Sequence, residues 1–155
     1  MAELTRWQVI DLLNRKAKLW LVGVDLSGLN LSRADLTGAD LEGANLTGTI
    51  LTRATMDYVN LEGAILNNAK LGGASLLRAN LMGARLIRAN LTGAKLEGAN
   101  LFRANLSDAN LVGANLYNAN LRQANLASAN LTDANLKAAI LPDGNIGMAT
   151  QPQTS

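Results

Sequence analysis

Residues 95–136 read KLEGANLFRANLSDANLVGANLYNANLRQANLASANLTDANL, and a leucine returns at every fifth position of this stretch, from Leu96 to Leu136. An alanine stands two places before each leucine from Leu101 onward. A period of five fits neither regular element, because such leucines would spread around an α-helix and would alternate between the two faces of a flat strand. The chain must therefore turn once in every repeat.

Each repeat divides into an extended part and a corner. If the leucine is position i, the residues at i−2 and i are apolar and the residue between them is polar, which is the alternation of a short strand. Positions i+1 and i+2 are rich in Gly, Ser, Thr, Asn, Asp and Arg, the composition of a turn. Repetition of the two parts gives a coil with all leucines facing one axis, and stacked coils form a β-solenoid.

The repeat A(D/N)LXX, as in residues 34–38 and 99–103, closely resembles the repeats of the pentapeptide repeat protein family. The resemblance implies an all-β solenoid, a right-handed quadrilateral β-helix with four repeats in each coil. Glycines at i+2 do not discriminate between four sides and two. The number of sides therefore comes from the resemblance, whereas the coil follows from the residues. The ending AILPDG, residues 139–144, resembles that of many members from photosynthetic bacteria.

The repeats occupy most of the chain. Residues 24–143 make 24 repeats, and all but the one centred on Met56 have leucine at the centre. Imperfect repeats begin at Leu19, so the β-helix is expected over residues 19–143. Its interior is expected to hold columns of leucine and alanine, since aromatic residues make up only 3% of the chain.

The two ends of the chain lack the repeat. Residues 1–18 carry a capping-box pattern and apolar residues at helical spacing, which predicts a short α-helical cap over the first coil. Trp7 and Trp20 are expected to lie against this cap. Residues 144–155 are expected to form a flexible tail after the turn signal of Pro142, Asp143 and Gly144. Either Ile146 and Met148 of this tail or a partner is expected to cover the last coil.

Composition argues against several functions. The chain has no cysteine and no histidine, which excludes a disulfide frame, a thiol nucleophile and a zinc site. We expect no cofactor and no enzymatic activity, because a packed rod offers no evident cleft and no histidine activates the corner hydroxyls. There is no apolar run of about 18 residues and no signal-peptide pattern, so we expect a cytoplasmic protein without membrane association.

Asparagine occupies position i−1 at ten places between Asn80 and Asn135. Regularly placed asparagines are compatible with carbohydrate or ice binding. Stacked side-chain amides that bond between coils are the structural alternative, and we favour it.

Charge varies along the repeats. Residues 25–64 contain six acidic residues and two arginines, and residues 65–105 contain six basic residues and one acidic residue. Residues 106–143 contain two basic and three acidic residues. The basic middle also carries apolar residues at i+1 and arginines at i+2. We predict that these residues bind a partner: Leu77, Met82, Ile87 and Phe102, with Arg78, Arg88 and Arg103. The alternative is that corners tolerate scattered apolar residues, as any surface does.

The expected function is that of a non-enzymatic scaffold that binds an unidentified protein through an outward face of the β-helix, as the family resemblance implies. Gyrase-protecting members suggest DNA-mimic-like binding to a topoisomerase, but mimicry requires a predominantly negative rod. Weak nucleic-acid binding through the basic middle finds little support in six spread charges and few stacking aromatics. Those members commonly carry a C-terminal dimerising helix, which this sequence lacks, so a monomer and an end-to-end dimer both stay open.

Overall fold

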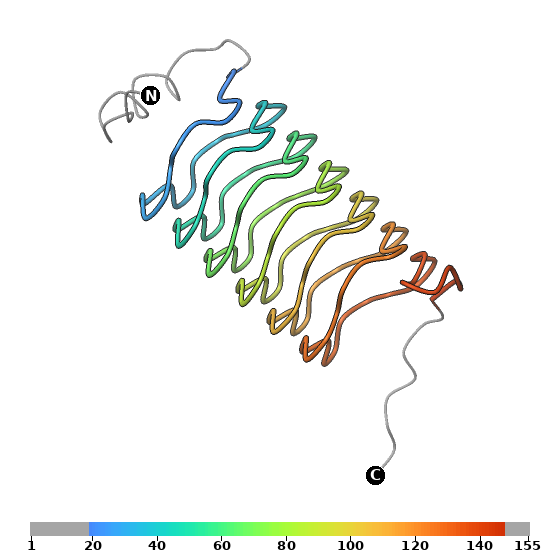
Figure 1. The fold of residues 1–155 in the computed structure, drawn as a ribbon. Helices are drawn as coiled ribbons and strands as arrows, with labels where there is room; N and C mark the ends of the chain where they lie inside the picture. The colour runs from blue at the N-terminus through green and yellow to red at the C-terminus, as the bar shows by residue number, and fades with distance from the viewer. Residues whose placement is uncertain (1–18, 148–155) are drawn as a thin grey trace.

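The chain winds into a stack of coils in a computed structural model that describes residues 19–147 (Figure 1). Parallel bridges join residues twenty apart along the whole stack, from Trp20 with Asp40 to Asn120 with Ile140. Since each repeat has five residues, four repeats make one coil and the coil has four sides. This register confirms the four-sided coil that the resemblance implied. The predicted N-terminal helix and Trp7 lie outside the described residues.

Each corner is a tight turn whose third residue is left-handed. The N–H of Ala84 donates to the carbonyl of Leu81 at 3.0 Å, and the same bond recurs along the chain. The residue at i+2 has a φ between 52° and 68° in every repeat from Gly23 to Ala138, while the residue at i+1 does not have a positive φ. This is the pattern of a type II turn. Glycine fills the left-handed position in 11 repeats and other residues fill it in 13.

Backbone hydrogen bonds tie neighbouring coils together on every side. The N–H of Leu81 donates to the carbonyl of Asn100 at 2.7 Å, and the N–H of Asn80 donates to the carbonyl of Val59 at 2.9 Å. In most repeats the backbone N–H of the residue at i+2 also donates to a carbonyl of the next coil, as Gly83 does to Phe102. Each side contributes one bridged residue rather than a longer strand, and residues 19–147 contain no helix.

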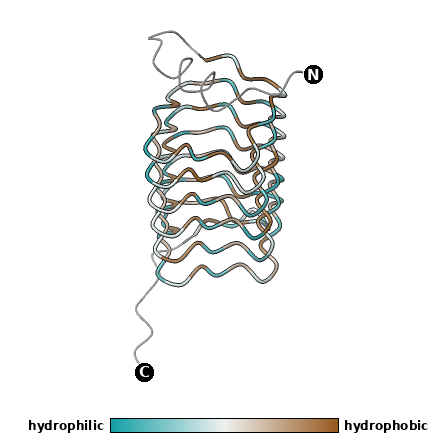
Figure 2. Ribbon diagram, turned by 90° about the vertical axis from the view of Figure 1, so that its left-hand side faces the viewer, coloured by the Kyte–Doolittle hydropathy of each residue, from teal (hydrophilic) through white to brown (hydrophobic). Residues whose placement is uncertain are grey.

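The core consists of the central leucines and the residues at i−2, stacked in columns inside the coil. Figure 2 shows apolar and polar residues alternating along each coil, as the repeat requires. Met56 takes the place of a leucine and is equally buried. Thr49 is a buried polar residue at i−2, and its hydroxyl donates to the carbonyl of Leu26 at 2.8 Å. Its polar group therefore has a partner inside the core.

The two ends of the described stack expose different core positions. In the first coil the residues at i−2, namely Leu19, Val24, Leu29 and Ala34, are only partly buried. In the last coil the partly buried residues are the central Leu126, Leu131 and Leu136, together with Ala129. Within each coil the i−2 layer thus lies toward the N-terminal end, and the leucine layer lies toward the C-terminal end.

The chain reverses direction after the last repeat, where the sequence predicted a turn. Gly144 has a φ of 89°, and Ile146 forms an antiparallel bridge with Ile140. Ile146 is 60% exposed, so the expectation that its side chain covers the last coil is wrong. Met148 lies outside the described residues.

Gly147, rather than Ile146, packs against the last coil. Its N–H donates to the carbonyl of Ala139 at 2.7 Å, and the residue is buried. A Cβ at this position would overlap the carbonyl oxygen of Leu136. The close approach of the two backbones therefore requires glycine here.

The four sides give the rod four faces, which we name A, B, C and D in chain order. Face A carries the residues at i−1 and i+1 around Leu21, Leu41, Leu61, Leu81, Leu101, Leu121 and Leu141. Face B carries those around Leu26, Leu46, Leu66, Leu86, Leu106 and Leu126, and face C carries those around the leucines five residues further on. Face D carries those around Leu36, Met56, Leu76, Leu96, Leu116 and Leu136. Faces B and D flank face A and lie opposite each other.

Candidate partner-binding surfaces

Most outward asparagines and aspartates are engaged in holding the wall together. The Oδ1 atom of the residue at i−1 accepts the backbone N–H of the residue at i+1, as Asn100 does from Phe102 at 3.2 Å. Such a side chain caps its own corner. The same bond is made at Asn30, Asn45, Asn60, Asn80, Asn90, Asn105, Asn110, Asn115, Asn120, Asn125, Asn130 and Asn135.

A ladder of side-chain amides runs along face A. Each asparagine of the ladder donates from its Nδ2 atom to the Oδ1 atom one coil nearer the N-terminus, at 3.0 to 3.3 Å, and the aspartate at the N-terminal end only accepts. The members, in order, are Asp40, Asn60, Asn80, Asn100 and Asn120. Asn135 donates to Asn115 in the same way on face D, at 2.9 Å. The predicted amide ladder is confirmed on these two faces.

Three carboxylates at i+1 also bond between coils. Each accepts a hydrogen bond from the side chain 18 residues further on: Asp57 from Ser75 at 2.5 Å, Glu62 from Asn80 at 3.1 Å and Glu97 from Asn115 at 2.6 Å. The Oε2 atom of Glu97 is buried and has no hydrogen-bond partner among the described residues. These acids belong to the wall rather than to a catalytic pair.

Two aspartates at i−1 have lowered pKa values. The backbone N–H of Ser27, with a smaller effect of its hydroxyl, lowers the pKa of Asp25 below 3.8. The hydroxyl of Thr37, followed by its backbone N–H, lowers the pKa of Asp35 below 3.8. In both cases hydrogen bonds to the ionised form favour the carboxylate. Both groups therefore carry a negative charge at neutral pH.

The apolar residues that the sequence singled out do not share one face. Met82 and Phe102 are both on face A, in neighbouring coils. Leu77 is on face D and Ile87 is on face B, so the rod separates them. All four side chains are partly buried. The structure therefore brings together one pair of the four.

The three predicted arginines are exposed, and each occupies a left-handed corner position. Arg103 donates from Nε to Oε1 of Gln123 at 2.8 Å, and its guanidinium carbon is 4.9 Å from the centroid of the Phe102 ring. The Cγ atom of Arg78 is 3.3 Å from the position that a Cβ on Gly98 would take. Arg78 and Arg103 thus reach toward the residue twenty positions on.

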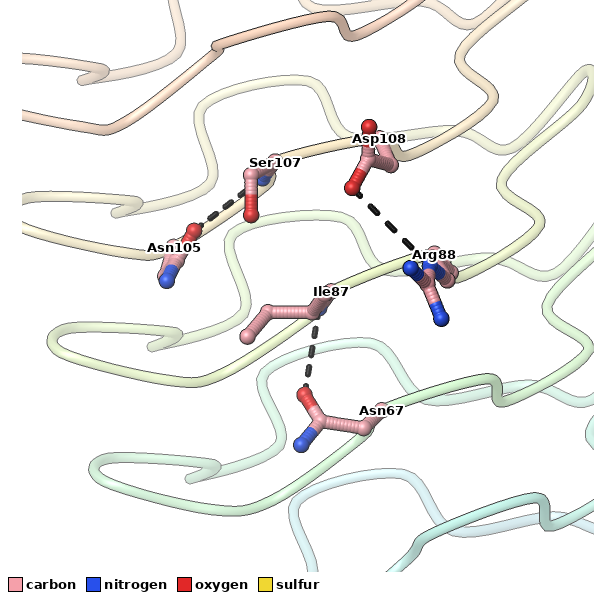
Figure 3. A network of polar contacts seen from close by, with 6 residues as sticks. All are labelled: Asn67, Ile87, Arg88, Asn105, Ser107 and Asp108. Atoms are coloured by element: carbon pink, nitrogen blue, oxygen red, sulfur yellow. Dashed lines mark hydrogen bonds and ion pairs between the residues drawn. The ribbon is translucent and has the colours of Figure 1, made fainter.

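Figure 3 shows the corner of Arg88 on face B. The Nε atom of Arg88 is 3.9 Å from Oδ2 of Asp108, one coil further along the chain. The backbone N–H of Ile87 donates to Oδ1 of Asn67 in the preceding coil at 3.2 Å, because Arg85 at i−1 offers no acceptor. A repeat without Asn or Asp at i−1 can thus have the N–H of its i+1 residue bonded by a side chain of the preceding coil.

Sequence reasoning missed two tyrosines. Tyr58 is 55% exposed and Tyr117 is 46% exposed, and in the described repeats between the two ends of the stack they are the most exposed large apolar side chains. Tyr117 is on face D, and Tyr58 is at the corner where face D meets face A. Leu77 and Arg78 stand in the coil between Tyr58 and Glu97. The twenty-residue register was the signal that could have placed them together.

Other kinds of site find little support in residues 19–147. No group of three or more acidic side chains is close enough to hold a metal ion there. None of these residues forms a helix with the length and apolar character needed to cross a membrane.

A family model described as pentapeptide repeats matches residues 30–68, 64–103 and 104–141, with eight copies. Proteins with these repeats fold as right-handed quadrilateral β-helices, in agreement with the four-sided coil. No curated protein matches the chain.

Three solved structures are similar to the chain. The pentapeptide repeat protein alr5209 from Nostoc PCC 7120 is 34% identical with a TM-score of 0.59, and the match covers 65% of this chain and 80% of that one. HetL, a pentapeptide repeat protein involved in heterocyst differentiation regulation from the cyanobacterium Nostoc sp. strain PCC 7120, is 36% identical with a TM-score of 0.34, covering 84% and 73%. The plasmid-mediated fluoroquinolone resistance protein QnrB1 is 20% identical with a TM-score of 0.66, covering 81% and 73%. The origin of alr5209 in Nostoc agrees with the photosynthetic source that the C-terminal sequence suggested.

Proposed function

Because the chain belongs to the pentapeptide repeat family, whose members are generally structural or interaction proteins rather than enzymes, we propose that it is a non-enzymatic scaffold. It binds another protein through an outward face of its β-helix. The residues proposed to make the contact form a strip on face D and on its corner with face A, which we call the face D strip. Its members are Tyr58, Leu77, Arg78, Lys95, Glu97 and Tyr117.

The observation that carries this proposal is the exposure of Tyr58 and Tyr117 around Leu77 and Arg78. Tyrosine and arginine are enriched at the centres of protein interfaces, because they bury a large area and still offer hydrogen bonds. The two tyrosines lie three coils apart, about 14 Å at a rise of about 4.8 Å per coil. That spacing suits a partner segment or a flat protein surface.

The remaining predicted residues are secondary in this proposal. Ile87 and Arg88 are on face B, opposite the face D strip, and Arg88 already faces Asp108. One partner that lies flat on face D would not contact them. DNA-mimic-like binding to a topoisomerase is not favoured, because Arg78 and Lys95 interrupt the acids of this face.

Affinity capture from a lysate of the source cells tests the proposal. The wild-type chain is compared with a Tyr58→Ser, Tyr117→Ser variant and with an Ile87→Ser variant, which makes an apolar-to-polar change on the opposite face. We expect one protein to be retained by the wild type and by Ile87→Ser and to be lost by the double variant. Circular dichroism must show that both variants keep the fold.

The other outcomes count against the proposal. Loss with Ile87→Ser alone would move the contact to face B. Retention by all three proteins would remove the face D strip from the contact. Capture of nothing by the wild type would overturn the scaffold function itself.

A further inference from the structure

The outward charges of face A are sorted along the rod. On the face and on the i+2 corner that follows it, acids stand in the N-terminal half and arginines stand in the C-terminal half, with two apolar side chains between them; Asp143, at the corner of the last coil, is the exception among residues 19–147. The acids are Asp40, Glu42 and Glu62, the apolar residues are Met82 and Phe102, and the arginines are Arg103 and Arg122. A face with this order is complementary to itself when it is turned end for end.

Several of these charges have no partner within the described part of the chain. Glu42 and Arg122 are exposed, and residues 19–147 offer neither side chain a hydrogen bond or an ion pair. Arg103 donates from its Nε atom to Gln123, and no residue between 19 and 147 accepts a hydrogen bond from its two terminal nitrogens. These groups are available to a second molecule.

The shape of face A permits close approach. Its i−1 positions from Asp40 to Asn120 are tied into the amide ladder, so these side chains lie along the wall. The corner position at i+2 is glycine in four successive coils, Gly23, Gly43, Gly63 and Gly83, so no side chain projects there. A second rod can therefore approach the i+1 column directly.

We infer that face A pairs with face A of a second copy of this chain, with the two rods antiparallel and related by a two-fold axis at Met82. Equivalent residues of neighbouring coils are always twenty positions apart. With the axis at Met82, two residues at i+1 therefore face each other when their numbers add up to twice 82, which is 164. Glu42 meets Arg122 of the second copy, and Met82 meets its own counterpart. A two-fold interface makes each such pair twice.

The other contacts of this register are also favourable. Glu62 meets Phe102 of the second copy, where the Arg103 guanidinium lies over the ring. Val22, which is 55% exposed, meets Pro142. Asp143 then lies at the level of Val22 and away from Glu42. Moving the axis by half a coil, to between Met82 and Phe102, would pair Glu62 with Arg122 and Met82 with Phe102 but would place Glu42 at Pro142 and beside Asp143. The two registers are distinguished by Glu42→Arg, which weakens the dimer only when Glu42 meets Arg122.

The interface is small. The column from Val22 to Pro142 spans six coil steps, or about 29 Å, and a width of two side chains gives a footprint of about 350 Å² per copy. Stable interfaces bury roughly 800 Å² per partner, so the dimer is weak and reversible. Since its specific contacts are charged, its dissociation constant rises with salt.

Sedimentation velocity on the full chain tests this inference at increasing protein concentration and at low and high salt. Arg122→Glu alone and Glu42→Arg alone each place like charges against each other twice. We expect each to raise the dimer dissociation constant by about tenfold or more. A mixture of the two single variants forms a heterodimer in which every Glu42–Arg122 contact has opposite charges again, so mixing restores association.

Control variants separate this pairing from different modes of association. Lys137→Glu makes the same change of charge on face D and leaves the dimer unchanged. A wild type that stays monomeric at millimolar concentration overturns the inference, as does a dimer that neither charge variant weakens, which points to end-to-end association. Mixing that fails to restore association overturns the antiparallel register. The face D strip borders face A only at the corner of Tyr58 and Arg78, and none of its members is in the i+1 column of face A, so capture of a partner by Glu42→Arg keeps the two proposals distinct.

Discussion

Asn80 donates its side-chain amide to Oδ1 of Asn60 at 3.1 Å, one coil nearer the N-terminus. The same amide donates to Oε2 of Glu62 at 3.1 Å, and the Asn80 oxygen accepts from the Asn100 amide at 3.3 Å. One side chain therefore joins three coils. The outer wall is held by side chains as well as by the backbone.

We expect Asn80→Ala to lower the free energy of unfolding by about 1–3 kcal/mol, because several hydrogen bonds are lost and their partners stay partly buried. Asn110→Ala is the matched control, since Asn110 is exposed and, among the described residues, its side chain bonds only to the N–H of Val112 in its own corner. Its loss should be about 1 kcal/mol or less. Urea titration measures both, and equal losses would show that the ladder adds nothing.

Leu106→Ala should lower the free energy of unfolding by about 2–5 kcal/mol, because Leu106 is fully buried and its removal leaves a cavity. Leu136→Ala should cost less, since Leu136 is partly exposed at the end of the described stack. Urea titration compares the two. A loss below about 1 kcal/mol at Leu106 would contradict the packed interior.

Gly83 has a φ of 64°, and nothing lies within 4 Å of the Cβ that alanine would add. Gly83→Ala should therefore cost about 1–2 kcal/mol through backbone strain alone. Gly83→Asn should cost less, because asparagine tolerates the left-handed region and Asn68 and Asn118 already occupy the same turn position. Thermal unfolding ranks the variants, and the opposite order would argue against a left-handed corner.

Asp25 and Asp35 should stabilise the fold only while they are ionised. Their pKa values are lowered below 3.8 in the folded chain, so the unfolded chain takes up protons first as the pH falls. The stabilisation is complete above about pH 5 and is lost as the pH falls through the folded pKa values.

The variant Asp25→Asn, Asp35→Asn tests this pH dependence, because asparagine keeps the corner cap, as Asn30 does. The stability difference between the wild type and the variant should be constant above about pH 5 and shrink toward pH 3. Urea titrations across this range measure it. A difference that grows with acid would reverse the assigned direction of the pKa shifts.

The coil and its interior could be predicted from the sequence because they depend on a pattern within each five-residue repeat. Leucine at i, a small residue at i−2 and turn formers at i+1 and i+2 require one turn every five residues. The number of sides could not be predicted in this way. It depends on which residues of one coil bond to which residues of the next coil. That information lies in hydrogen bonds such as that from Leu81 to Asn100, nineteen residues apart.

The candidate surfaces could not be predicted for the same reason, because they depend on which residues of neighbouring coils lie side by side. Leu77 and Ile87 are close in sequence, but two corners separate them and place them on opposite faces. Tyr58 and Tyr117 are far apart in sequence, yet the register places them beside the same face. Likewise, the cap on Ile87 comes from Asn67, twenty residues back, which no local pattern indicates.

The constant register also determines how this rod can change length. Removing twenty consecutive residues would shorten it by one coil and leave all four faces in line. Removing five would keep every leucine inside but rotate everything downstream by a quarter turn, so that Arg122 would leave the column of Met82 for that of Leu77. Deletion of a single repeat therefore changes which residues share a face of the rod, while the leucine core stays intact.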